Sequence, residues 1–361
     1  DVPVFDQCEP NPGIADVKGI AEAFIQNKCD SAIGLGGGGP LDATKGGLAL
    51  VAQMRVDPFF SLETQSADFI GKTCRQYAAY ANDDPDYVAA IPPMCAVPTT
   101  SGTGSDGGKS AVICDEMGTK VVFGHPKLMP LFAALVPQFT AGMPGGLTAA
   151  TGIDAIFHSL EAYLVPTDIM INRDKMTMEE IEYCDSFALM GIELACRSLK
   201  KAVSTPDDLQ SRLEMQISAL YGAKAFRKGD LGGVHAAAHA IGARYHLHHG
   251  ACIARMSYPV LNYSENKEGY SEEAKTRSQN VKEIISGNNS QSALSEEVKG
   301  FVNNFENVGV KTGIKDIIPT KDADAEIAAL GNLAGLDGCQ TNPIALDEAD
   351  YTRIFALARQ Y

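Results

Sequence analysis

The hydrophobic pattern of residues 1–142 alternates between helical and strand-like periods. Residues 14–28 carry apolar side chains at helical spacing, and residues 29–36 form a short apolar run ending in glycine, as a buried parallel strand does. Residues 40–52 open with a proline at an expected first helical position and continue at helical spacing. This succession predicts a doubly wound α/β domain. The other strands expected in it are residues 94–98, 120–124 and 131–136.

The pattern changes near residue 142, within the segment A-G-M-P-G-G. Beyond it nearly every long segment has helical periodicity, and β-branched strand-like runs disappear. We therefore expect an α/β domain at residues 1–142 and an all-helical domain at residues 143–361. Residues 264–300, rich in Glu, Lys, Ser and Asn, are expected to form solvated helix and loop.

Composition narrows the class of protein. The 361 residues are 45% hydrophobic and 21% charged, which suits a globular protein. The net charge of −15 argues against nucleic-acid and anionic-membrane partners, and no apolar run approaches the length of a membrane span. The chain starts in a polar segment without a signal-peptide pattern, and its nine cysteines include no C-x-x-C pair. We therefore expect reduced thiols and a cytoplasmic protein.

Two glycine-rich turns each follow an expected strand. The first is G-L-G-G-G-G-P-L-D (34–42), and the second, P-T-T-S-G-T-G-S-D (98–106), adds hydroxyl donors. Backbone N–H groups at such turns and at the following helix N-terminus bind phosphate groups. Each turn by itself is also compatible with a purely structural role. Two of them at the carboxyl ends of neighbouring parallel strands favour a dinucleotide site.

Potential metal ligands gather in two helical stretches. Asp154 and His158 are four residues apart, which places both on one helix face, and His235 and His239 repeat that spacing before the pair at 248–249. One carboxylate with several imidazoles is a ligand set for Fe²⁺ or Zn²⁺. A chance Asp-x3-His pair and a solvated His-rich segment are the alternatives. The two glycine-rich turns upstream favour the interpretation as a metal site over these alternatives.

These motifs resemble, in order and spacing, those of the iron-containing (group III) alcohol dehydrogenases, whose fold is that of the dehydroquinate synthase superfamily. The resemblance covers nearly the whole chain. It implies an α/β Rossmann-like nucleotide-binding domain followed by an all-α metal-binding domain. The motifs that carry it are G-G-G-G-P-L-D-A-T-K (36–45), P-T-T-S-G-T-G-S-D (98–106), L-T-A-A-T-G-I-D-A-I-F-H-S-L-E-A-Y (147–163), V-H-A-A-A-H-A-I-G-A-R-Y-H-L-H-H-G (234–250) and T-N-P-I-A-L-D-E-A-D-Y (341–351).

The resemblance also implies which residues form the site. Asp154, His158, His235 and His249 fall on the family's metal ligands, and His239 falls on a histidine beside the nicotinamide that relays a proton. The implied metal is Fe²⁺, with Zn²⁺ as the alternative, and the implied cofactor is NAD or NADP. The residues that fall on cofactor-contacting positions are Gly37, Gly38, Gly39, Asp42, Thr99, Thr100, Thr103, Lys120 and Thr140.

Among the features that depart from the family pattern, two bear most on the site and the fold. His248 stands where the family has proline or a similar residue, so His248 and His249 compete for the role of fourth ligand, and the following Gly250 favours His249. Family members also open with a strand, helix and strand that precede the position matched by Asp1 of this chain. We therefore expect about 60 residues of the first βαβ portion to be missing.

The implied reaction is hydride transfer between a nicotinamide and a small primary alcohol or aldehyde, carried out by a homodimer or larger homo-oligomer. Three alternatives remain: a hydroxyacid–oxoacid transhydrogenase of the same family, a dehydroquinate-synthase-like or polyol-phosphate enzyme, and a decayed non-catalytic binding protein. The second needs several basic residues in its cleft, whereas only Arg244 and Arg255 lie near the metal motifs. The intact ligand set argues against the third. Phe157 and Tyr163 either line the substrate pocket or fill the core.

Overall fold

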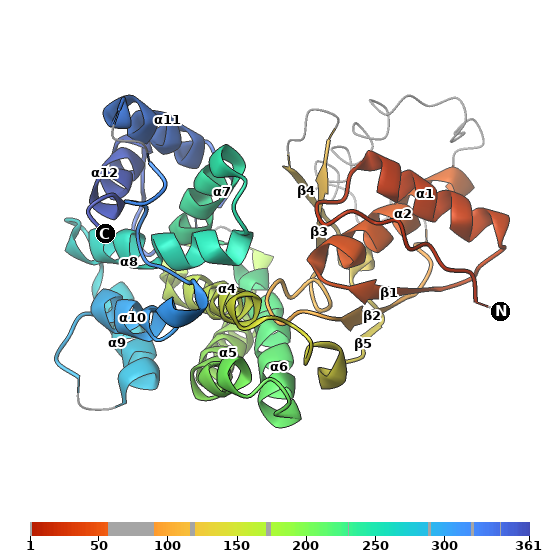
Figure 1. The fold of residues 1–361 in the computed structure, drawn as a ribbon, viewed down its shortest axis with the longest axis horizontal. Helices are drawn as coiled ribbons and strands as arrows, with labels where there is room; N and C mark the ends of the chain where they lie inside the picture. The colour runs from red at the N-terminus through yellow and green to blue at the C-terminus, as the bar shows by residue number, and fades with distance from the viewer. Residues whose placement is uncertain are drawn as a thin grey trace. The chain divides into compact units, whose positions relative to one another are not determined.

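The computed structural model describes residues 2–56, 90–115, 120–170, 175–229, 231–287, 290–318, 321–339 and 341–361. Its contacts divide the chain into two compact units, Asp1–Thr140 and Ala141–Tyr361. The division falls close to residue 142, where the sequence pattern changes. Figure 1 shows strands and helices in the first unit and helices in the second.

The first unit contains a parallel sheet with the strand order β1-β2-β5. Strand β1 (Ala32–Gly36) pairs along its length with β2 (Met94–Pro98), which also pairs with β5 (Phe132–Ala133). Helix α2 (Gly38–Val56) packs against β1 and β2, and helix α1 (Ile14–Gln26) packs against α2. Because β1 and β2 are parallel neighbours, the glycine turn after β1 and the threonine-rich turn after β2 leave the same edge of the sheet.

The expected strand at 120–124 is confirmed, but it lies in a different sheet. β4 (Lys120–Gly124) pairs antiparallel with β3 (Ser110–Cys114), which the sequence analysis did not predict. The expected strand at 131–136 was too long, since only Phe132–Ala133 pair with β2. Both differences arise because strand pairing depends on neighbours in space, which an apolar run does not specify.

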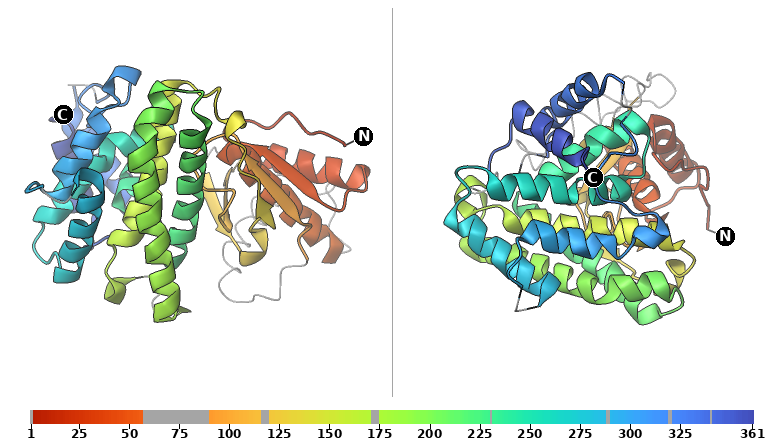
Figure 2. Two further views of the ribbon diagram at one scale, coloured as in Figure 1. Left: turned by 90° about the horizontal axis from the view of Figure 1, so that it is seen from below. Right: turned by 60° about the vertical axis from the view of Figure 1, so that its left-hand side comes forward.

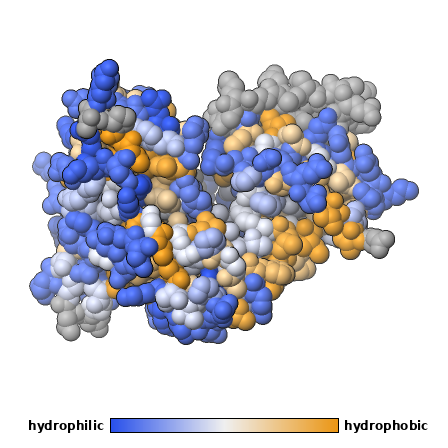
Figure 3. Space-filling model, viewed as in Figure 1, coloured by the Kyte–Doolittle hydropathy of each residue, from blue (hydrophilic) through white to orange (hydrophobic). Residues whose placement is uncertain are grey.

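The expectation that residues 29–36 form a fully buried strand is wrong. Ile33 and Leu35 alternate with the glycines of β1 and are 69% and 56% exposed, and Phe132 of β5 is 58% exposed. Gly34 faces the other way, because a Cβ built there would lie 3.1 Å from Leu41 of α2. One face of this sheet is therefore covered by α2, while the other presents apolar side chains. Figure 3 shows hydrophobic residues gathered over this part of the first unit.

The described residues of the second unit form helices joined by loops and contain no strand. Helix α4 (Gly145–Leu164) packs against α5, α6, α8 and α9, and every side chain from Thr148 to Leu164 is buried (Figures 1 and 2). None of the described helices is both long and apolar enough to cross a lipid bilayer. The helices that follow α4 are α5 (Met178–Ser204), α6 (Leu209–Ala225), α7 (Gly233–Tyr245), α8 (His249–Asn266), α9 (Glu272–Ser286), α10 (Leu294–Asn303), α11 (Ala323–Gly335) and α12 (Glu348–Ala358).

Several helices of this unit begin at side-chain caps that the sequence encodes locally. The hydroxyl of Thr177 accepts the N–H of Glu180, and the Glu180 carboxylate accepts the N–H of Thr177, which is a capping box at the start of α5. Helix α7 is different, because its N-cap is Gly232, which has no side chain to cap it. The N–H groups at this helix start need partners from elsewhere in the fold.

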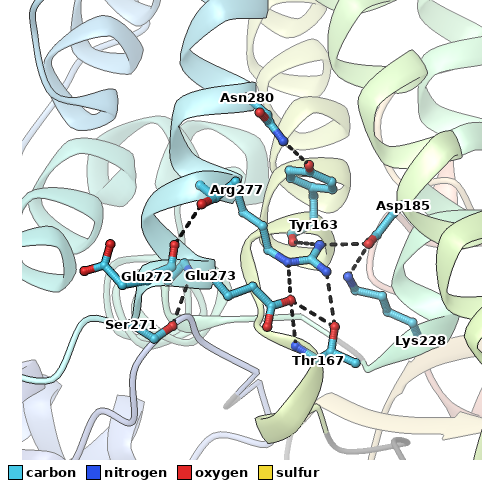
Figure 4. Close-up of polar contacts among 11 residues, drawn as sticks. Tyr163, Thr167, Asp185, Lys228, Ser271, Glu272, Glu273, Arg277 and Asn280 are labelled. Atoms are coloured by element: carbon cyan, nitrogen blue, oxygen red, sulfur yellow. Dashed lines mark hydrogen bonds and ion pairs between the residues drawn. The ribbon is translucent and has the colours of Figure 1, made fainter.

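The two aromatic residues of α4 belong to the core. Phe157 is buried, and Tyr163 lies under two cations, with Arg277 and Lys228 at 5.0 Å and 5.9 Å from its ring centroid. The Tyr163 hydroxyl accepts a hydrogen bond from Asn280 at 2.8 Å. Figure 4 shows this polar network around the end of α4. Of the two interpretations of these residues, the structure supports core packing.

Candidate metal centre

Three imidazole nitrogens of the second unit surround one carboxylate oxygen. Nε2 of His235 and Nε2 of His249 each lie 3.5 Å from Oδ1 of Asp154, and Nε2 of His158 lies 3.7 Å from the same oxygen. Asp154 and His158 share a face of α4, His235 lies in the first turn of α7, and His249 is the first residue of α8. Asp154, His235 and His249 have ligand atoms within 4.8 Å of one another, and His158, the fourth predicted ligand, lies beside Asp154.

Close helix contacts at two glycines create this convergence. A Cβ on Gly250 would lie 2.3 Å from the carbonyl oxygen of Ala150, so the first turn of α8 rests directly on the α4 backbone. A Cβ on Gly222 of α6 would lie 2.9 Å from Cβ of His158. Larger residues at either position would push the helices apart and move His249 or His158 away from the centre.

The donor set fits a divalent cation. Oδ1 of Asp154 and Nε2 of His235 are buried, and neither has a hydrogen-bond partner among the described residues. Such atoms each cost about 1–3 kcal/mol when left unpaired. Ligand atoms about 2.1 Å from a tetrahedral metal are about 3.4 Å apart, close to the 3.5 Å that separates Oδ1 of Asp154 from Nε2 of His235 and of His249. A carboxylate with three imidazoles suits Fe²⁺ or Zn²⁺.

The structure distinguishes His249 from His248. His249 is half-buried and faces Asp154, whereas His248 is exposed and occupies the N-cap position of α8. Adjacent residues at a helix start point in different directions, so only one of the two reaches the centre. The position of Gly250 against α4 selects His249.

Glu161 is a buried carboxylate beside the centre that the sequence analysis did not assign. Its carboxylate accepts the Nδ1–H of His235 at 2.5 Å and the backbone N–H groups of Val234 and Gly232 at 2.6 Å and 3.1 Å. It therefore caps α7 and fixes His235 as the tautomer whose Nε2 is available to a metal. A signal existed in the sequence, since Glu161 follows Asp154 by seven residues, two helical turns on the same face.

The charges of the centre shift its ionisation. Burial raises the pKa of Asp154, but the neighbouring His158 and His249 outweigh burial and hold it well below its usual value. Burial lowers the pKa of His235, but Glu161 and Asp154 reverse this effect and raise it to about 9. Burial lowers the pKa of His249 to about 4. The carboxylates of Glu161 and Asp154 therefore favour the form of His235 in which both ring nitrogens are protonated when no metal is bound.

His239 lies beside the four predicted ligands. Its ring is stacked on that of His249 with centroids 5.2 Å apart. Its Nδ1–H donates to Oδ2 of Asp337 at 3.0 Å, and the backbone N–H of Cys339 donates to the other oxygen of Asp337 at 2.8 Å. Although burial raises the pKa of Asp337, these bonds and the Cys339 thiol lower it to about 2. Asp337 had no local signal in the sequence, because 98 residues separate it from His239.

The two glycine turns of the first unit lie against each other. The N–H of Thr99 donates to the carbonyl oxygen of Gly36 at 2.9 Å, and a Cβ on Gly38 would lie 2.8 Å from Cγ2 of Thr103. A Cβ on Gly39 would lie 2.7 Å from the carbonyl oxygen of Pro10. The absence of side chains lets the backbone pack tightly at the N-terminus of α2, where a phosphate group would bind. A Cβ on Gly37 would lie 3.2 Å from Cγ2 of Thr100 at the same place.

Asp42, expected on a cofactor loop, lies within α2 and is buried. Its carboxylate accepts the hydroxyl of Ser105 at 2.6 Å and the N–H of Val112 at 3.0 Å. Lys45, which the sequence analysis did not assign, donates to the carbonyl oxygens of Ser105 at 2.7 Å and Gly108 at 3.0 Å. Burial raises the pKa of Asp42 and lowers that of Lys45. This buried pair shapes the second turn.

The two remaining cofactor candidates differ in exposure. Lys120 is exposed at the start of β4. Thr140 is buried at the end of the first unit, and its hydroxyl donates to the carbonyl oxygen of Pro137 at 2.9 Å. That Lys120 and Thr140 contact the cofactor stays a prediction.

Known proteins match nearly the whole chain. The family model for iron-containing alcohol dehydrogenase matches residues 1–137, and the model for the C-terminal part of the Fe-containing alcohol dehydrogenase family matches residues 148–358. The 4-hydroxybutyrate dehydrogenase of Cupriavidus necator is 31% identical over 98% of this chain and 84% of its own length. The NAD-dependent methanol dehydrogenase of Bacillus methanolicus is 28% identical over 98% and 84%.

A solved structure of a similar protein also matches this chain over nearly its whole length. A crystal structure of 1,3-propanediol oxidoreductase superposes with a TM-score of 0.78 and 26% identity, over 99% of this chain and 84% of that one. An α/β unit with two glycine-rich turns and a helical unit with an Asp-His₃ donor set, together with these matches, place the chain among metal-dependent oxidoreductases. Within that class, the chain belongs to the iron-containing alcohol dehydrogenase family.

Proposed function

We propose that the chain is a divalent-metal- and NAD(P)-dependent dehydrogenase that interconverts a small primary alcohol and its aldehyde. The convergence of three imidazole Nε2 atoms on Oδ1 of Asp154 within 3.5–3.7 Å carries the proposal. The relatives support the substrate class, since methanol, 1,3-propanediol and 4-hydroxybutyrate are all primary alcohols.

Asp154, His158, His235 and His249 would hold Fe²⁺ or Zn²⁺. When bound, the cation supplies Lewis-acid polarisation of the substrate oxygen. Glu161 keeps the Nδ1 of His235 protonated and leaves Nε2 for the metal side. The buried sides of α4 and α7 exclude water from the two atoms that need a cation most, Oδ1 of Asp154 and Nε2 of His235.

His239 is placed to move the proton. Its Nδ1–H is fixed by Asp337, so Nε2 is the nitrogen that exchanges a proton with the substrate hydroxyl. Its side chain is 33% exposed, which gives the proton a route to solvent. During alcohol oxidation His239 accepts the hydroxyl proton, and during aldehyde reduction it returns one.

The first unit would hold the dinucleotide. The N–H groups at the start of α2, with Gly37, Gly38 and Gly39, would bind the pyrophosphate, and Thr99, Thr100 and Thr103 would add hydroxyl donors. The nicotinamide supplies or accepts the hydride. Asp42 and Lys45 would contribute indirectly, because their hydrogen bonds to Ser105 hold the conformation of the second turn.

The test is a hydride-transfer assay on protein purified without oxygen. The protein is stripped of metal, reloaded with Fe²⁺ or Zn²⁺, and mixed with NADH or NADPH and a panel of short aldehydes. We expect oxidation of one cofactor, dependent on the added metal and lost in His235→Ala. Metal binding without net oxidation, combined with exchange between a hydroxyacid and an oxoacid, would replace the dehydrogenase by the transhydrogenase. Failure to bind metal would overturn the proposal.

A further inference from the structure

We infer that His239, Asp337 and Cys339 form a second divalent-cation site next to the first, suited to a borderline ion such as Zn²⁺. One ligand atom from each of the three residues lies within 4.8 Å of the other two. None of the three belongs to the four-residue centre around Asp154. The trio joins α7 to the segment that follows α11, so cation binding here would link two elements far apart in sequence.

The local geometry holds two of the ligands in place. Nδ1 of His239 lies 3.0 Å from Oδ2 of Asp337, and the backbone N–H of Cys339 donates to Oδ1 of Asp337 at 2.8 Å. Nitrogen and sulfur ligands of tetrahedral zinc are about 3.5 Å apart. The ligand atoms of His239, Asp337 and Cys339 all lie within 4.8 Å of one another, which brings them within reach of one ion.

The ligand types of His239, Asp337 and Cys339 determine which cations this site prefers. Thiolate and imidazole ligands favour Zn²⁺ and Co²⁺ over Mg²⁺ and Ca²⁺. One carboxylate and one thiolate neutralise a divalent charge. The side chains of His239 and Asp337 are 33% and 20% exposed, so an ion reaches them from solvent, and a water molecule can complete its coordination.

Occupation of this site has a consequence for the proposed reaction. A cation on Nδ1 of His239 breaks its hydrogen bond to Asp337, on which the proton transfer depends. This consequence, unlike the binding itself, rests on the proposed function. We therefore expect Zn²⁺ beyond the first equivalent to inhibit turnover, and Cys339→Ser to relieve that inhibition.

Cobalt titration tests the site independently of activity. Co²⁺ is added without oxygen to metal-free wild-type protein, and binding is followed by calorimetry and absorption. We expect two equivalents per chain and a sulfur-to-cobalt charge-transfer band in the near ultraviolet. The band is diagnostic, because the ligands around Asp154 include no sulfur.

Variants separate the two centres. His235→Ala should keep the band and lose the other equivalent, whereas Cys339→Ser and Asp337→Asn should lose the band and keep the other equivalent. Cys114→Ser, at a partly buried thiol in β3, is the matched control and should keep both. Binding of a single equivalent without the band, in a protein that still transfers hydride, would overturn the second site and leave the proposed function standing. A band that persists in Cys339→Ser would also overturn it.

Discussion

The Nδ1–H of His235 donates to the Glu161 carboxylate at 2.5 Å, and the same carboxylate accepts the N–H groups of Gly232 and Val234 at the start of α7. One buried side chain on α4 thus sets both the position of α7 and the tautomer of a predicted metal ligand. Carboxylates that hold metal-bound histidines in this way raise their basicity and orient their rings. The centre is therefore stabilised by the same side chain that holds the start of α7 against α4.

Replacing Glu161 by Gln should weaken metal binding by about 10–100-fold. The amide presents N–H donors to a site that contains only donors, so one contact with His235, Gly232 or Val234 is lost. The metal-free protein should also lose about 1–3 kcal/mol of unfolding free energy. Zn²⁺ affinity is measured by chelator competition, and unfolding by denaturant titration.

The matched control for this variant is Ser159→Ala. Ser159 lies on the same helix and is equally buried, but its hydroxyl has no hydrogen-bond partner among the described residues. This substitution should leave the metal affinity unchanged. Equal affinities of wild type and Glu161→Gln would show that Glu161 does not position His235.

His249→Ala and His248→Ala should differ sharply. Removing His249 takes away an imidazole that lies 3.5 Å from Asp154, so metal binding and hydride transfer should both be lost. Removing the exposed His248 should leave metal content near wild type, because its side chain is not part of the centre. Metal analysis after dialysis, together with an aldehyde reduction assay, compares the two. Loss of metal in His248→Ala with retention in His249→Ala would reverse the ligand assignment.

Metal affinity should rise with pH. In the metal-free protein the pKa of His235 is raised to about 9, so below that pH a proton must leave before a cation binds. Affinity should therefore increase about tenfold per pH unit between about pH 7 and pH 9 and level off above. The pKa of His249 is about 4 and that of Asp154 is low, so neither adds to the slope in this window.

A pH series of Zn²⁺ competition titrations, corrected for the chelator's own protonation, measures the slope. In Glu161→Gln the levelling should move to lower pH, since the charge that raises the His235 pKa is gone. A flat wild-type profile across this range would contradict the proton on His235.

Lys45→Met should destabilise the first unit by about 3–5 kcal/mol, because it leaves the buried Asp42 and several carbonyl oxygens without their cation. NADH binding should weaken, while Zn²⁺ affinity of the second unit should not change. Fluorescence titration with NADH and thermal unfolding are the measurements. Lys18→Met, at an exposed pair with Glu22, serves as control and should cost at most about 1 kcal/mol. Unaltered NADH affinity in a folded Lys45→Met protein would exclude the role of Lys45 in shaping the turn.

The sequence by itself determined several elements of the first unit and the place where the α/β pattern gives way to helices. Helical and strand-like periods located α1, β1, α2 and β2, because each depends on side chains a few residues apart. The spacing of Asp154 and His158 placed both on one face of a helix for the same reason. The motifs around them were specific enough to indicate the family.

Only the tertiary structure decided which groups support these ligands and which strands pair. Asp337 meets His239 across 98 residues, Lys45 meets Ser105 across 60, and β3 pairs with β4 in a sheet of its own. Such contacts depend on packing between elements, and no local period records them. The choice of His249 over His248 depends on Gly250 resting against Ala150, a contact between two helices that only the folded chain contains.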